Sequence, residues 1–127
     1  FFGRLETRKG LVLFCDALDQ LGQEFPDLRV TFLGRHGRVA GRTSKEYLPE
    51  RGQRWPFAWR VVSDLDQPAA LAYLRGEGRL AVMASTMDNS PNTVYECLGM
   101  RVPFVAAHTG GIPELIAPED VGRVCFA

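Results

Sequence analysis

Short apolar runs alternate along the chain with longer stretches of helical periodicity. The apolar runs have the length of buried strands and lie at residues 1–3, 29–34, 58–63, 79–83, 102–107 and 123–127. Between the first two runs, residues 10–24 place apolar side chains three or four positions apart, which predicts an amphipathic helix. This alternation is typical of a parallel sheet covered on both faces. We therefore predict an α/β fold, a doubly wound, Rossmann-like three-layer sandwich with a parallel sheet.

Proline and capping residues predict where further helices begin. Pro68 suits the first turn of a helix that Gly76 or Gly78 would end. Ser90 as the cap and Pro91 as the first helical residue predict a second helix that continues to about Met100. The stretch IPELI at 112–116 is expected to begin another helix.

The long connection at residues 35–56 is rich in glycine and proline and has no clear periodicity. Ser44 would cap a short helix through Leu48 within it. Three aromatic side chains near its end are expected to pack this connection rather than to bind sugar: Trp55, Phe57 and Trp59.

Composition limits the classes of function. A length of 127 residues, with 46% hydrophobic and 24% charged residues, fits one globular domain. The 15 basic and 15 acidic residues give zero formal net charge, so there is no global field to attract nucleic acid, and any anion site must be local. The 3 cysteines lie far apart without CxxC spacing, which argues against a metal knuckle or disulfide scaffold and suits a reducing compartment.

The chain opens with FFGRLE, without an initiator Met, a basic leader or a long apolar segment. We therefore expect no signal peptide, no transmembrane segment and a cytoplasmic location. Strand-like residues at both ends suggest that residues 1–127 are one domain cut from a longer protein.

Glycine and polar residues gather directly after the predicted strands. They are Gly3-Arg4, Gly34-Arg35, Ser63-Asp64, Ala84-Ser85 and the stretch 108–111. Because a doubly wound sheet binds ligands at the carboxyl ends of its strands, this edge is predicted to be the functional edge, independently of any family.

Two cations, Arg8 and Lys9, fall where the first turn of the helix at 10–24 is expected. Positive charge there opposes the helix dipole, at about 0.3 to 1 kcal/mol for each exposed residue. A bound anion would reverse the sign, and Arg4 would join Lys9 and the free helix amides around a phosphate. Solvated surface cations are the alternative on these residues alone.

The stretch MDNSPNTVYE at 87–96 combines two carboxylates, Asp88 and Glu96, with a helix start. Dipole complementation by Asp88 and an outward-facing Glu96 are the ordinary explanations. However, carboxylates accept hydrogen bonds well from sugar hydroxyls. Two carboxylates and two helix starts at one edge therefore suit a diphosphate flanked by two sugars. The free amides of the second helix start would belong to Asn92, Thr93 and Val94.

In order and spacing, these segments resemble the carboxyl-terminal, donor-binding half of a group 1 (family 4) glycosyltransferase of the GT-B fold. The resemblance spans nearly the whole chain. The matching motifs are FFGRLETRKG (1–10), DLRVTFLG (27–34), the Asp88-x7-Glu96 pair within residues 83–106, and TGGIPELI (109–116).

The resemblance implies a role for each candidate residue. Arg4 and Lys9 would hold the donor diphosphate, and Asp88 would bind the hydroxyls of the transferred sugar; these three form the implied catalytic set. Glu96 would bind the ribose hydroxyls. The base would stack near Val62 and Ser63, and the donor site would be completed by Gly3, Asn92, Thr93 and Val94.

The resemblance also implies the reaction. A hexosyl group would pass with retention from a nucleotide-sugar donor to an acceptor glycan or lipid-linked sugar. The acceptor would be held by an amino-terminal domain outside these residues, which would also make any peripheral membrane contact. Fixed cations and amides would stabilise the leaving diphosphate without a metal or cofactor. The isolated fragment is expected to bind donor without turning it over.

Three departures from the family pattern stand out. Asp88 replaces the usual Glu, which is longer by one methylene, so the contact to the donor sugar shifts. Asn89 and Pro91 replace glycines, and Pro91 offers no N–H. Arg101 replaces a helix-ending glycine, at a cost of about 1 kcal/mol if its backbone is left-handed.

Two other classes remain open from the residues. One is a non-enzymatic nucleotide-binding or receiver-like α/β module, which would not need both cations and both carboxylates. The other is a GT-B relative that acts as a nucleotide-sugar epimerase or phosphorylase. His36 and His108 are expected to be structural or solvated in either case.

Overall fold

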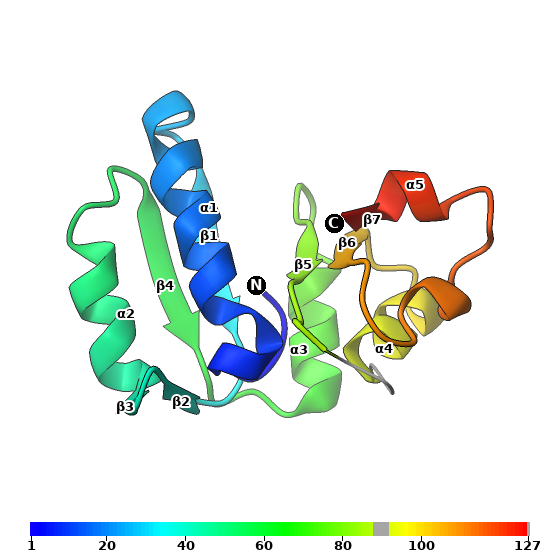
Figure 1. The fold of residues 1–127 in the computed structure, drawn as a ribbon, viewed down its shortest axis with the longest axis horizontal. Coiled ribbons are helices and arrows are strands. Elements are labelled where there is room, and N and C mark those ends of the chain that lie inside the picture. The colour runs from blue at the N-terminus through cyan, green and yellow to red at the C-terminus, as the bar shows by residue number, and fades with distance from the viewer. Residues whose placement is uncertain (88–91, 127) are drawn as a thin grey trace.

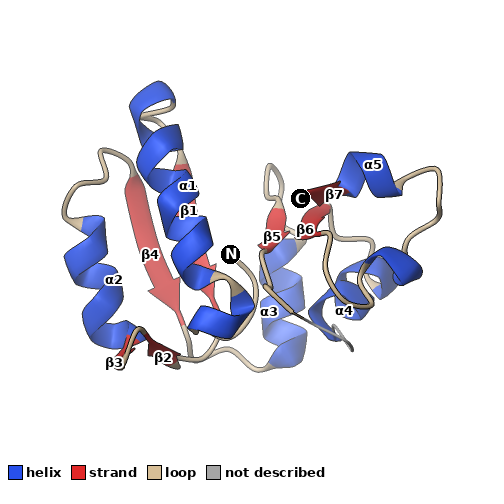
Figure 2. Cartoon of the chain, viewed as in Figure 1, coloured by secondary structure: helices blue, strands red, loops and turns tan. Residues whose placement is uncertain are grey.

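The computed structural model describes residues 1–87 and 92–126, in which helices and strands alternate (Figures 1 and 2). The strands are β1 (Arg29–Leu33), β2 (Arg38–Val39), β3 (Arg42–Thr43), β4 (Ala58–Val62), β5 (Ala81–Met83), β6 (Phe104–Ala107) and β7 (Cys125–Phe126). The helices are α1 (Leu11–Glu24), α2 (Ser44–Gly52), α3 (Gln67–Leu74), α4 (Asn92–Gly99) and α5 (Val121–Val124), with 3-10 turns η1 (Thr7–Lys9) and η2 (Pro113–Leu115).

The amino-terminal residues 1–3 join two groups of parallel strands. Strand β1 pairs with β4, and β5 pairs with β6, which pairs with β7. Between them, the Gly3 N–H donates to the Leu33 carbonyl at 3.1 Å, and the Phe2 N–H donates to the Val82 carbonyl at 3.0 Å. Figure 1 shows the amino terminus between β1 and β5. The strand order β4, β1, residues 1–3, β5, β6, β7 confirms the predicted Rossmann-like fold.

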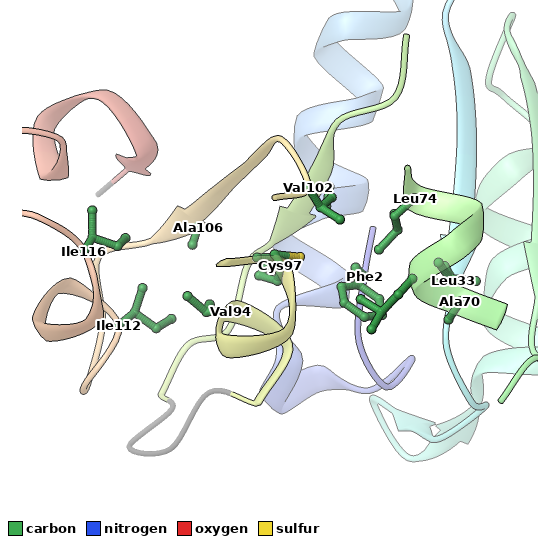
Figure 3. Close-up of a cluster of buried hydrophobic side chains, with 13 residues drawn as sticks. Phe2, Leu33, Ala70, Leu74, Val94, Cys97, Val102, Ala106, Ile112 and Ile116 are labelled. Atoms are coloured by element: carbon green, nitrogen blue, oxygen red, sulfur yellow. The ribbon is translucent and has the colours of Figure 1, made fainter. Parts of the chain in front are cut away.

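Alternate residues of the strands face two separate cores. Phe1 and Phe32 pack with α1 and α2, whereas Phe2 and Leu33 pack with α3 and α4 on the other face (Figure 3). This period-two alternation, with helices on both faces, is what a doubly wound sheet requires. The sheet therefore separates the two cores and leaves its carboxyl edge for a ligand.

The aromatic residues near the end of the long connection pack into the core, as the sequence predicts. Trp55 and Phe57 are 8% and 4% exposed, and their rings stack with centroids 5.5 Å apart. Trp55 also stacks on Phe32 of β1 at 5.8 Å. These side chains close the core beneath α1 and α2 and do not line the carboxyl edge.

The connection itself contains more structure than its sequence suggests. Strands β2 and β3 form a small antiparallel pair, and α2 runs beyond the predicted short helix. The predicted cap was wrong: the Thr43 hydroxyl accepts from the Lys45 N–H at 3.0 Å. Ser44 is instead fully buried, and its hydroxyl contacts His36 Nδ1 at 2.6 Å and the Gly37 N–H at 3.1 Å.

Two other helix predictions differ from the structure. The stretch at 112–116 forms only the 3-10 turn η2, because buried Ile112 and Ile116 anchor both of its ends and Ile116 is extended at ψ 138°. Arg8 and Lys9 lie in η1, before α1 rather than in its first turn. The left-handed Gly10 at φ 81° separates the two elements. Arg101, which replaces a helix-ending glycine of the family pattern, does adopt the left-handed conformation, at φ 54°.

The predicted helix start at Ser90 and Pro91 lies outside the described residues. Within residues 1–87 and 92–126, no helix has both the length and the apolar character needed to cross a membrane.

Candidate functional site

A cavity of about 360 Å³ opens at the carboxyl ends of residues 1–3, β1 and β4. Helices α3 and α4 complete its wall. Its lining residues are Phe2, Gly3 and Arg4; Leu33, Gly34 and Arg35; Val62, Ser63 and Leu65; Asp66, Gln67 and Ala70; and Thr93 and Glu96. The cavity thus lies on the edge where this fold binds ligands, and its volume is in the range of small-molecule sites.

Glycine allows the strand ends below the cavity to approach closely. A Cβ added at Gly34 would lie 1.8 Å from the Gly3 carbonyl oxygen. Beyond this contact, the Leu5 N–H donates to the Arg35 carbonyl at 2.8 Å. These contacts fix the backbone beside the two cationic side chains that line the cavity, Arg4 and Arg35.

The loop after β5 is held against the turn before α1. The backbone N–H and the hydroxyl of Thr86 both donate to the Arg8 carbonyl, each at 3.1 Å. Gly10 packs directly on Ala84 in the same place. The start of α1 and the end of β5 therefore meet at the point where the strand order reverses.

Glu96 brings a carboxylate to the cavity from the middle of α4. It is half-buried, and its Oε1 accepts a hydrogen bond of 2.7 Å from Gln67 Nε2 at the start of α3. Burial raises the pKa of Glu96, and the hydrogen bond from Gln67 opposes this by stabilising the charged form. Thr93, one turn earlier, lines the cavity beside it.

Six of the residues predicted from the sequence surround this one cavity: Gly3, Arg4, Val62, Ser63, Thr93 and Glu96. Lys9, Asn92 and Val94 are not among its lining residues. The Val94 side chain is fully buried in the core under α4, so only its backbone could face a ligand. Asp88 lies outside the described residues.

Eight lining residues were not predicted as site residues. Three of them carry polar or charged side chains: Arg35, Asp66 and Gln67. The other five are Phe2, Leu33, Gly34, Leu65 and Ala70. Arg35 directly follows Gly34 after β1, and this place after a strand is the sequence signal that could have identified it as a site residue. Asp66 caps α3, because its Oδ1 accepts from the Ala69 N–H at 2.9 Å. The contact of Gln67 with α4 depends on tertiary packing and has no local sequence signal.

Among residues 1–87 and 92–126, histidine and metal-ligating side chains do not form a second candidate site. His36 is tied to Ser44, and burial together with the charge of Lys45 lowers its pKa. In the described part of the chain, no group of three or more His, Cys, Asp or Glu side chains is placed to hold a metal ion.

A larger cavity, of about 810 Å³, lies at the opposite edge, by the amino ends of β1, β4 and β5. Its walls include apolar side chains of α1 such as Leu18 and Leu21. The larger cavity is also lined by polar side chains, among them Arg60, Tyr73 and Arg79. We take the smaller cavity as the candidate ligand site because it lies at the carboxyl ends of the strands, where doubly wound folds bind ligands.

The chain matches the family model for "Glycosyl transferases group 1" over residues 1–127. It is 27% identical over 124 residues to the sulfoquinovosyl transferase SQD2 of Arabidopsis thaliana, a match that covers 98% of this chain and 22% of that protein. The chain thus spans about a fifth of the length of this relative. No solved structure matches the chain significantly. The family match over the whole chain and the Rossmann-like fold agree, and the chain belongs to the group 1 glycosyltransferases.

Proposed function

We propose that the carboxyl-edge cavity binds the nucleoside diphosphate part of a nucleotide-sugar donor. One observation carries this proposal: Arg4 and Glu96, from opposite ends of the chain, line the same cavity at the carboxyl ends of the strands. A cation suits the diphosphate and a carboxylate suits the ribose hydroxyls, so one ligand satisfies both groups.

The diphosphate lies at the side of the cavity that carries Arg4. The guanidinium of Arg4 offers a planar fork of donors that matches phosphate oxygens, and Arg35 supplies a second guanidinium at the same rim. Lys9, in the turn that precedes α1, adds a further cation toward the leaving oxygen. These preorganised charges stabilise the negative charge that develops on the diphosphate as the sugar leaves.

The nucleoside lies toward β4 and α4. The Glu96 carboxylate accepts hydrogen bonds from the ribose hydroxyls, and the base packs against Val62 and Ser63 at the end of β4. The half-buried position of Glu96 strengthens these hydrogen bonds relative to an exposed carboxylate.

The transferred sugar is a hexosyl group whose hydroxyls contact Asp88, and the transfer retains anomeric configuration without a metal. The name of the Arabidopsis relative specifies transfer of a sulfoquinovosyl group, which supports sugar transfer as the reaction class. In this proposal the acceptor is a glycan or a lipid-linked sugar held by an amino-terminal domain, as the resemblance to GT-B enzymes implies.

Calorimetric titration with UDP, GDP and ADP tests the proposal. We expect one nucleotide to bind, and Arg4→Ala and Glu96→Ala each to weaken it by roughly tenfold or more, as loss of a hydrogen bond to a charged group would. Arg8→Ala and Glu24→Ala are matched controls, because both residues are exposed and neither lines the cavity. Absence of binding to all three nucleotides, or equal affinity in all variants, would contradict the proposal.

A further inference from the structure

Gln67 forms a side-chain bridge between two helices at the wall of the cavity. It is the first residue of α3, and its Nε2 donates to Glu96 Oε1 of α4 at 2.7 Å. Both residues line the cavity. The bridge therefore ties the Glu96 carboxylate, at the cavity wall, to the first residue of α3.

Both ends of this bridge are firmly supported. Asp66 caps α3 immediately before Gln67, and Pro68 follows it in the first turn, so the backbone there is restricted. Further along, α3 and α4 share one core around Phe2 (Figure 3). Packing thus fixes the spacing of the two helices, and the exposed Gln67 side chain reaches Glu96 across it.

A carboxylate offers about four lone-pair sites on its two oxygens. The hydrogen bond from Gln67 occupies one site on Oε1 and restricts rotation of the group, which leaves Oε2 and the remaining site of Oε1 for other donors. A vicinal diol, such as the 2′- and 3′-hydroxyls of ribose, presents two donors at a fixed spacing. A carboxylate held in one orientation distinguishes such a diol from a sugar with one hydroxyl better than a rotating carboxylate does.

From this geometry we infer that Gln67 is a positioning residue, which orients the Glu96 carboxylate and thereby gives the site its preference for ribose over deoxyribose. This role rests on the proposed function of the cavity. It acts through Glu96 and requires no contact between Gln67 and the reacting atoms.

Two substitutions with opposite expected signs test this role. Gln67→Met keeps the size of the side chain and removes the donor, so the pKa of Glu96 should rise. Gln67→Lys supplies a cationic donor, so the pKa of Glu96 should fall below its wild-type value. The pKa is measured without ligand, by NMR titration of the Glu96 side-chain carboxyl carbon. Gln20→Met, on the exposed face of α1, is the matched control.

The ligand arm uses whichever of UDP, GDP and ADP binds most tightly, together with its 2′-deoxy counterpart. Wild type should prefer the ribonucleotide, and Gln67→Met should reduce the ratio of the two affinities by roughly three- to tenfold, while Gln67→Lys should preserve it. A merely structural bridge would change the melting temperature and leave this ratio unchanged.

The outcomes separate the two proposals. An unchanged pKa of Glu96 in Gln67→Met overturns the positioning role, whether or not a nucleotide binds. A raised pKa with an unchanged ribose preference also overturns it. Wild type that binds both sugars equally overturns the positioning role, whereas wild type that binds no nucleotide overturns the proposed function of the cavity.

Discussion

Gly10 lies directly against Ala84: a Cβ added at Gly10 would come within 1.7 Å of the Ala84 carbonyl oxygen. This contact joins the start of α1 to the end of β5, where the direction of strand addition reverses. Since Gly10 also has φ 81°, no other residue combines the needed backbone conformation with so close an approach.

Gly10→Ala should therefore destabilise the fold by at least about 2 kcal/mol, because it adds a backbone clash to an unfavourable φ. Gly78→Ala is the matched control, since Gly78 has φ 73° but no atom within 4 Å of an added Cβ. That control should lose only about 1 kcal/mol. Urea denaturation of the two variants compares them, and equal losses would show that the contact with Ala84 does not matter.

Arg101→Gly should stabilise the fold. Arg101 follows α4 in the left-handed region at φ 54°, which glycine adopts without steric cost. The expected gain in the free energy of unfolding is about 0.5–1 kcal/mol, reduced somewhat by the greater freedom of glycine in the unfolded chain. A lower midpoint of chemical denaturation for Arg101→Gly would indicate that the arginine side chain makes compensating contacts.

Acid should weaken the link between α1 and α2. Burial alone would raise the pKa of Asp19, but hydrogen bonds from Arg51 and Trp55, both at 2.7 Å, outweigh burial and lower it. Because the folded pKa lies below the unfolded one, the stabilisation is present above the unfolded pKa and is lost as pH falls through the folded pKa.

Asp19→Asn should therefore be less stable than wild type at neutral pH, and the difference should shrink as the pH falls below about 4. Denaturation midpoints measured across this range would show it. Glu24→Gln removes one exposed carboxylate from the same helix and serves as the control. A difference for Asp19→Asn that stays constant down to the lowest pH would mean that its charge does not contribute.

The sheet could be predicted from the sequence because buried strands leave continuous apolar runs. The runs at 29–34 and 58–63 became β1 and β4 almost residue for residue, and their loops met at one edge as expected. The family model matches the whole chain, in agreement with the resemblance that the motifs at these strand ends suggest. By contrast, the helix expected at 112–116 is only a 3-10 turn, since burial of its terminal isoleucines overrides local helical pattern.

Side-chain relationships across the cavity could not be predicted in the same way. The hydrogen bond from Gln67 to Glu96 joins residues 29 apart in sequence and depends on how α3 and α4 pack. Ser44 was misassigned for a similar reason: its hydroxyl serves the buried loop at His36 and Gly37, while the neighbouring Thr43 caps α2.

The most direct test of the donor site is an NMR titration of the 15N-labelled chain with UDP, GDP and ADP. We predict that one nucleotide shifts amide signals at the carboxyl ends of three strands and on α4, at Gly3-Arg4, Gly34-Arg35, Val62-Ser63 and Thr93 to Glu96. Shifts confined to the opposite edge, around Leu18, Leu21 and the amino ends of β1 and β4, would contradict the assignment of the carboxyl-edge cavity as the donor site.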